Sequence, residues 1–359
     1  MSIPQYYLYI HPMDLKELKS DIWIDEPVPA SLKYGKKKVE IDLAYRGSHI
    51  RKFKKKSYHI AFYKPKTFAG VHEIHMNAEF KDPSLIRNKL SLDFFADIGT
   101  LSPASRHVQI FINGKNEGIY LQLESVDKYF LKKRNLPDGA IFYAVDDDAN
   151  FSLISPIDKD SKKQLDSGYE RKVGQESDSL KLANFIYQLN TAPRSEFENI
   201  IKKFLNIDKY LRWLAGVVCT QNYDGFVHNY ALYLNYETGL FEMIPWDYDA
   251  TWGRDIHGEV MEYDYVRSEG FNTLTARLLD VPSYRLQYGK ILKAILDDQF
   301  TVEYITPKIE KMHNLLRPYV ARDPFIKDKT QAFDQEPVYI CQFIKDRNLY
   351  LRKKLSDFL

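Results

Sequence analysis

The chain has 359 residues, of which 44% are hydrophobic and 28% charged, and its formal net charge is +2. This length is sufficient for two lobes with a large hydrophobic core. The small net charge excludes a general attraction to nucleic acid or membrane, and no apolar run reaches the roughly 20 residues of a membrane-spanning helix. The first residues alternate like a strand rather than a signal peptide. Cys219 and Cys341 stand in apolar surroundings, which predicts buried thiols in a reducing cytosol.

The first 145 residues are predicted to be rich in strands. Alternating apolar residues at 38–45 and the Asn-Gly pair at 113–114 indicate hairpins. Asp82 and Pro83 are typical of a helix start. The expected elements are strands at 5–12, 31–34, 38–45, 57–63, 107–112, 118–123 and 140–145, and helices at 14–20, 84–97 and 126–134.

The pattern changes after residue 145. Residues 146–175 are polar and begin with three aspartates, which predicts a crossover or a loop. Helical spacing follows, interrupted by a hairpin with strands at 230–234 and 240–244. Helices are expected at 177–189, 195–205, 208–220, 284–296 and 338–358. The sequence therefore predicts an α+β protein with a β-rich N-terminal lobe at 1–145 and a mainly helical C-terminal lobe at 146–359.

An acid, an amide and a second acid surround the predicted 230–244 hairpin. Asp224 lies in the loop before it, Asn229 directly precedes its first strand, and Asp247 follows its second strand. Because a hairpin brings its ends together, Asn229 and Asp247 can meet around one ion. An ATP-dependent kinase needs one carboxylate to orient the acceptor hydroxyl, then an amide and a second carboxylate to hold Mg²⁺. Asp and Asn are also common turn residues, so the order of the elements carries this prediction.

Two neighbours of this set have alternative interpretations. Asp249 is either a second metal ligand or a cap for residues 250–253, and alternation would aim it to the same side as Asp247. His228 is interpreted as a loop histidine bonded to the backbone, because no serine or cysteine nucleophile is near it in sequence.

The basic run at 51–56 is either a solvated loop or a phosphate-binding segment. As part of a strand, Lys54 and Lys56 would share one face and Lys55 would lie on the other. Glu124 is either an ion-pair partner for such a lysine or a surface or capping residue.

Tyr143 and Trp246 border the cleft expected between the two lobes. Most aromatic residues belong to a core, but a purine base also needs a ring on which to stack. Both residues are therefore candidates for nucleotide binding as well as for packing.

Separated motifs occur along most of the chain. They are Arg-Gly-Ser at 46–48, Lys-Lys-Ser-Tyr at 55–58, Asp-Pro-Ser-Leu-Ile-Arg-Asn-Lys-Leu at 82–90, Gly-Ile-Tyr-Leu-Gln-Leu-Glu at 118–124, Asn-Tyr-Asp at 222–224 and Pro-Trp-Asp at 245–247. In these motifs and their order the sequence resembles the CotH family, the spore-coat protein kinases of endospore-forming bacteria.

The resemblance implies an atypical protein-kinase-like fold and phosphorylation of serines in other coat proteins, with ATP and Mg²⁺ (or Mn²⁺) as cofactors. It implies that Asp224 is the catalytic aspartate, that Asp247 and Asn229 bind the metal, and that Lys55 or Lys56 binds phosphate. Asn-Tyr-Asp and Asp-Tyr-Asp replace the His-Arg-Asp and Asp-Phe-Gly of ordinary kinases, and Ala-Pro-Glu is absent, which argues against an activation loop.

The resemblance also implies a role in spore coat assembly, in the mother-cell cytoplasm and the coat. Serine-rich, basic coat proteins are the expected substrates, which Asp146–Asp148 would attract. No membrane or nucleic-acid partner is expected, and a monomer is compatible with this activity.

Two other functions are compatible with the same residues. A metal-dependent phosphoesterase or nuclease would use Asp247 and Asp249 as a metal pair and the basic run to hold a phosphate backbone. A scaffold without enzymatic activity would keep the fold alone.

Overall fold

The computed structural model describes residues 2–63, 67, 68 and 70–359. By their internal contacts these residues form two compact units. Unit 1 comprises Met1–Lys89, Ala104–Ser125 and Pro307–Tyr339, and unit 2 comprises Leu90–Pro103, Val126–Thr306 and Ile340–Leu359. Each unit is assembled from separate chain segments, whereas the sequence analysis places a single boundary after residue 145.

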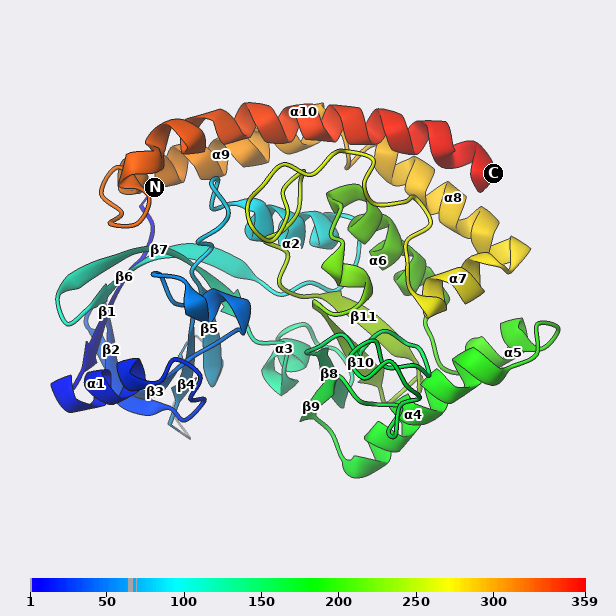
Figure 1. The fold of residues 1–359 in the computed structure, drawn as a ribbon, viewed down its shortest axis with the longest axis horizontal. Coiled ribbons are helices and arrows are strands. Elements are labelled where there is room, and N and C mark those ends of the chain that lie inside the picture. Colours follow the sequence, from blue (N-terminus) through cyan, green and yellow to red (C-terminus); the bar gives the residue numbers. More distant parts are fainter. Residues whose placement is uncertain (1, 64–66, 69) are drawn as a thin grey trace. The chain divides into compact units, whose positions relative to one another are not determined.

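Unit 1 is organised around a closed barrel with the strand order β1-β2-β3-β4-β5-β7-β6 (Figure 1). Neighbouring strands are antiparallel except β1 and β6, whose parallel pairing closes the barrel. Side chains of β1 alternate between exposed and buried, as expected for a strand with one face on a core. The strands are β1 (Gln5–Ile10), β2 (Val28–Tyr34), β3 (Lys37–Tyr45), β4 (Tyr58–Phe62), β5 (Glu73–Asn77), β6 (Ser105–Ile112) and β7 (Lys115–Glu124).

Helices accompany the barrel strands. Within unit 1 they are α1 (Pro12–Ser20) and the short 3-10 helices η1 (His49–Lys52) and η3 (Lys327–Lys329). The boundary between the units runs through α2 (Arg87–Asp97), α9 (Val302–Val320) and α10 (Thr330–Lys354).

Unit 2 contains an antiparallel sheet with the order β11-β10-β8-β9. Every residue of β10 and β11 is buried, and α6 packs against β11 and α8. The strands are β8 (Gly139–Ala144), β9 (Tyr169–Val173), β10 (Tyr230–Asn235) and β11 (Phe241–Pro245). The helices are α3 (Lys128–Lys133), α4 (Glu176–Thr191), α5 (Phe197–Ile201), α6 (Ile207–Thr220), η2 (Asp224–Phe226), α7 (Thr273–Leu279), α8 (Pro282–Asp297) and η4 (Leu355–Asp357).

The mixture of helices and strands confirms the predicted α+β class. The loop predicted over 146–175 is wrong at its end, where β9 pairs with β8. Helix α10 includes Pro337 and begins earlier than predicted, because one proline removes only one backbone hydrogen bond from a long helix. The prediction of buried thiols is confirmed for Cys219 and wrong for Cys341, which is partly exposed.

Candidate active site

The predicted hairpin forms and fixes two of the candidate residues in unit 2. Strands β10 and β11 pair from Leu234 with Phe241 to Tyr230 with Pro245. One residue further, the Trp246 amide donates to the Asn229 carbonyl over 3.1 Å. Asn229 and Asp247 therefore both lie at the open end of one hairpin.

The loop that carries Asp224 is held by its own residues. Helix α6 ends at Thr220, the Asn222 side-chain oxygen accepts from the Gly225 amide over 3.0 Å, and the Asp224 carbonyl accepts from the His228 amide over 2.9 Å. A Cβ at Gly225 would lie only 3.1 Å from the Tyr248 hydroxyl oxygen. The absence of a side chain at this position thus lets the loop pack against the segment that follows Asp247.

Four residues in and near this site have a left-handed backbone conformation. Asn229 and Asp247 both have a φ of 60°, and Gln221 and Trp252 have φ values of 58° and 52°. Residues other than glycine rarely adopt this left-handed backbone conformation. It costs of order 1–3 kcal/mol per residue and is common at functional sites. The strain at Asn229 and Asp247 therefore supports a functional interpretation of the hairpin end.

Electrostatics connects Asp224 with the hairpin end. Burial raises the pKa of the Asp224 carboxyl, and the carboxylates of Asp147 and Asp247 raise it further. His228 acts in the opposite direction, and its Nδ1 lies 3.1 Å from the Asp147 carboxylate. Several acids thus act on one another at a half-buried position, which is the arrangement that a bound cation stabilises.

The donors at this site suit a hard cation of the magnesium type. Within the described part of the chain, no three His, Cys, Asp or Glu side chains are grouped closely enough to hold a metal by themselves. Mg²⁺ commonly takes one or two protein carboxylates and completes its shell with water and substrate phosphates. Asp247 with the Asn229 amide oxygen fits that limited protein contribution.

A hollow of about 250 Å³ lies next to Asp224. Asn222 lines it as well, and its buried Nδ2 finds no hydrogen-bond acceptor among the described residues. A buried donor without a partner costs free energy unless a ligand or water satisfies it. The remaining lining residues are Tyr223, Ala250, Asp255, Ile256, Met261 and Tyr265. Asn222 is a residue whose role the sequence did not indicate, although it belongs to the Asn-Tyr-Asp motif.

The segment after Asp247 alternates in exposure. Asp247 and Asp249 both keep solvent access, whereas Trp246 and Tyr248 are buried. The Trp246 ring is only 7% exposed and packs edge-to-face on Tyr143, with ring centroids 5.0 Å apart. Tyr143 also accepts a hydrogen bond from the Val126 amide through its hydroxyl. This aromatic pair supports the strand end, and it leaves little of the Trp246 face for a purine.

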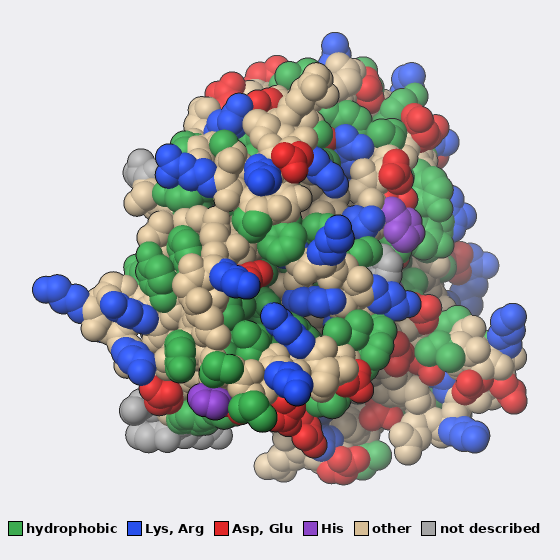
Figure 2. All heavy atoms as spheres, turned by 60° about the vertical axis from the view of Figure 1, so that its left-hand side comes forward, with side chains coloured by type: hydrophobic (Ala, Val, Ile, Leu, Met, Phe, Trp, Pro, Cys, Tyr) green, Lys and Arg blue, Asp and Glu red, His purple; other side chains and the backbone are tan. Residues whose placement is uncertain are grey.

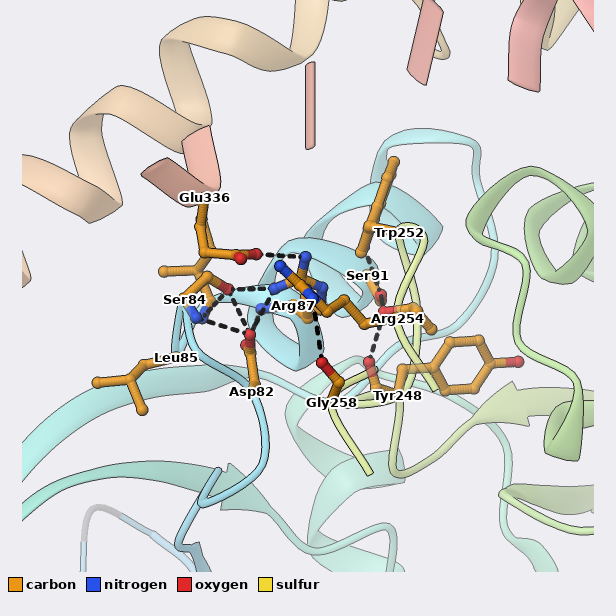
Figure 3. Close-up of polar contacts among 12 residues, drawn as sticks. Asp82, Ser84, Leu85, Arg87, Ser91, Tyr248, Trp252, Arg254, Gly258 and Glu336 are labelled. Atoms are coloured by element: carbon orange, nitrogen blue, oxygen red, sulfur yellow. Dashed lines mark hydrogen bonds and ion pairs between the residues drawn. The ribbon is translucent and has the colours of Figure 1, made fainter. Parts of the chain in front are cut away.

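Ser91 fixes the continuation of this segment. The Trp252 indole donates to the Ser91 hydroxyl over 2.9 Å (Figure 3), and the Thr251 hydroxyl lies 3.1 Å from the same oxygen. Thr251 also donates to the Tyr248 carbonyl over 2.8 Å. No sequence pattern indicated these contacts, because Ser91 is distant along the chain.

The two candidate lysines have different surroundings in unit 1. Lys55 is buried, donates to the Ile119 carbonyl, and lies 3.8 Å from the Asp323 carboxylate. Burial lowers the pKa of Lys55, and Asp323 opposes this shift. Lys56 is partly exposed and donates to the Arg51 carbonyl. Lys55 is therefore held by a carbonyl and a carboxylate of unit 1. No sequence pattern indicated Asp323 as its partner.

Two further motif residues in unit 1 also have structural partners. The Glu124 carboxylate accepts from the Ala104 amide over 2.9 Å. Arg87 is fully buried and pairs with Asp82 and Glu336 at 2.6 Å each (Figure 3). Asp82 also accepts from the Ser84 and Arg87 amides, so it holds the turn before α2 instead of capping a helix that begins at residue 84.

The comparisons with known proteins agree on a family. A model described as CotH kinase protein matches residues 43–351. Inner spore coat protein H of Bacillus subtilis (strain 168) is 60% identical over 99% of this chain and 98% of its own length. The inner spore coat protein H-like protein of the same organism is 29% identical over 84% of this chain and 86% of its own length.

Among solved structures, a chain of the Shewanella oneidensis MR-1 toxin–antitoxin complex of HipA, HipB and operator DNA is similar, with a TM-score of 0.42. It has 13% identity, covering 97% of this chain and 74% of that chain. Within the described residues, no helix combines the length and apolar character of a bilayer span. On the match to the family model and the 60% identity to a spore coat protein, the chain belongs to the CotH kinase protein family.

Proposed function

We propose that this protein is an ATP- and Mg²⁺-dependent kinase that phosphorylates serine residues of spore coat proteins and thereby contributes to coat assembly. The observation that carries the proposal is the half-buried Asp224 in the loop before a hairpin whose strained open end holds Asn229 and Asp247. Family membership and the identity to a spore coat protein support the coat as its place of action.

Asp224 is proposed to accept a hydrogen bond from the serine hydroxyl and to orient it toward the phosphate. The adjoining hollow, which Asp224 and Asn222 both line, gives a side chain access to this position. Burial and like charges raise the pKa of Asp224, which makes its carboxylate a better proton acceptor than an ordinary aspartate.

Asn229 and Asp247 are proposed to contribute the oxygen ligands of the metal, which is Mg²⁺ or Mn²⁺. The bound ion would neutralise charge on the transferring phosphate. Both residues have a strained backbone at one end of a paired hairpin. A rigid scaffold of this kind limits how far the protein must reorganise when the metal binds.

The proposal does not assign a phosphate-binding lysine. Lys55 is buried beside the Asp323 carboxylate and Lys56 is partly exposed, and neither set of contacts singles out one of the two lysines for phosphate. Tyr143 and Trp246 are proposed to position Asp247 through packing, instead of stacking on the purine base.

Serine-rich, basic coat proteins are the proposed substrates, met in the mother-cell cytoplasm and in the coat. Asp147 is partly exposed beside His228, so it adds negative charge near Asp224 that would favour a basic segment. The proposed catalytic residue and metal ligands all come from one chain, which is compatible with an active monomer.

Transfer of labelled γ-phosphate from ATP to a serine-rich basic peptide tests the proposal. Asp224→Asn should lower the rate by about 10²–10⁴-fold, the usual contribution of a positioned acid or base. The exposed Asp158→Asn is the matched control and should leave the rate unchanged. Unfolding curves of the three proteins should coincide closely.

Undiminished transfer by Asp224→Asn would contradict the assignment of this residue. Cleavage of a phosphodiester without ATP would instead support the phosphoesterase. Normal coat assembly by the Asp224→Asn, Asp247→Asn double variant would favour a scaffold.

A further inference from the structure

Unit 1 carries two adjoining hollows along α1. One measures about 500 Å³ and lies between α1, the segment before β4 and the β6–β7 turn. The other measures about 490 Å³ and continues over α1. Both are lined by Leu15 and Lys19, so the two hollows adjoin at α1 and are treated together as one groove.

The groove is strongly basic. We call it the lysine groove, and its lysines are Lys16, Lys19, Lys54, Lys56 and Lys115. Figure 2 looks onto this side of unit 1, where Lys and Arg side chains gather across the surface. Lys16 and Lys19 are three residues apart on α1 and therefore share a helix face.

The positive charge of the groove is largely uncompensated. Glu117 is the carboxylate among its described lining residues. Burial raises the pKa of Glu117, while Lys19 and Lys115 oppose the shift. Both ammonium groups therefore act on the same carboxylate. In the part of the chain that the structure describes, Lys16, Lys19, Lys54 and Lys115 form no ion pair. Lys55, in contrast, already pairs with Asp323.

The shape and the charge together indicate the ligand. Lysine ammonium groups are compact point charges that suit phosphate, and a phosphoserine carries about −1.5 to −2 charges near neutral pH. Five lysines distributed over two adjoining hollows fit a chain with several phosphates better than one small anion. The buried side chains of Ile10, Leu18 and Ile112 add an apolar floor for such a chain.

We propose that the lysine groove binds segments of the protein substrate whose serines have already been phosphorylated. This inference rests on the proposed function, since a serine kinase produces this ligand. A substrate with many serines would then be retained after its first phosphates are added, while further serines react.

Binding of a synthetic serine-rich peptide with several phosphoserines tests the inference without ATP or catalysis. The full-length protein is titrated against the fluorescent peptide, and its unphosphorylated form is measured in parallel. The phosphorylated form should bind at least about tenfold more tightly, and added salt should weaken it. The double variant Lys19→Gln, Lys115→Gln should lose roughly tenfold in affinity.

Lys36→Gln, Lys37→Gln is the charge-matched control, because both lysines are exposed in unit 1 but do not line the groove. It should bind within about twofold of the wild type. Equal affinity for both peptides, or an unaffected groove variant, would overturn the inference. Displacement of the peptide by ATP would assign the groove to nucleotide, and equal binding of an oligonucleotide of the same charge would assign it to nucleic acid.

The binding result is separate from the kinase proposal. Asp224→Asn should bind the phosphopeptide like the wild type, because Asp224 belongs to unit 2 and does not line the groove. Tight binding without any phosphate transfer would refute the kinase and leave a phosphopeptide-binding protein. Transfer without groove-dependent binding would refute only the present inference.

Discussion

Two groups of charged side chains, one in each unit, differ in how their charge is neutralised. In unit 1, Arg87 lies between Asp82 and Glu336, and Lys55 lies beside Asp323, so each buried cation faces a carboxylate. In unit 2, Asp224 is influenced by two other aspartates and opposed by a histidine. Charge is balanced around the buried Arg87 and Lys55 and is predominantly negative around Asp224.

This difference separates structural from chemical roles better than residue type does. A balanced, hydrogen-bonded ion pair holds chain segments together and has no need of a ligand. A carboxyl group whose pKa is raised by burial and by neighbouring carboxylates is completed by a cation or by a proton. By this criterion, the segment from Asp82 to Arg87 stabilises the fold, and we propose that the Asn-Tyr-Asp and Pro-Trp-Asp motifs carry the chemistry.

Arg87→Met gives the largest expected effect on stability. It leaves the Asp82 and Glu336 carboxylates buried without their cation, which should cost about 3–5 kcal/mol in the free energy of unfolding. Arg194→Met is the matched control, because Arg194 pairs with Asp280 at the surface, and it should cost no more than about 1 kcal/mol. Denaturant titration of both variants measures the difference. Equal losses of unfolding free energy would show that the buried group of Arg87, Asp82 and Glu336 contributes no more to stability than the surface pair.

The sequence predicted the candidate site well where the determinants are local. The hairpin from Tyr230 to Pro245 follows from strand pattern and turn residues, and its pairing brings Asn229 next to Trp246. Asp224 lies in the loop after α6, as expected from the helical pattern that ends near Thr220. Short-range rules therefore suffice for the residues of the hairpin and its preceding loop.

Features that depend on distant partners were not predictable in this way. Lys55 pairs with Asp323, a residue far away in the sequence that no local pattern indicates as its partner. Strand β9 lies in a polar segment, and only its pairing with β8 makes it a strand. The barrel closes through the parallel pair of β1 and β6, for which no turn or periodicity gives a signal. In each case the decisive contact comes from a remote part of the chain.

Asn229→Gly separates the strain at the hairpin end from its chemistry. Glycine adopts the φ of 60° without strain, so stability should be unchanged or slightly higher, whereas loss of the proposed amide ligand should lower phosphate transfer by about 10²-fold. Asn135→Gly is the matched control, since Asn135 is exposed and has a φ of 52°. It should leave transfer unchanged. Full activity of Asn229→Gly would remove Asn229 from the proposed metal ligands.

His228→Gln should produce the smallest effect, a shift in the pH dependence of phosphate transfer. The positive charge of His228 lowers the pKa of Asp224, which burial and the neighbouring aspartates raise. Without the imidazole this pKa rises, so Asp224 is protonated at a higher pH and the acidic limb of the profile moves upward, by about one unit or less. His11→Gln, an exposed histidine of unit 1, should leave the limb in place. A shift of the limb to lower pH would mean that the titrating group is not Asp224, because loss of an adjacent cation cannot favour its ionised form.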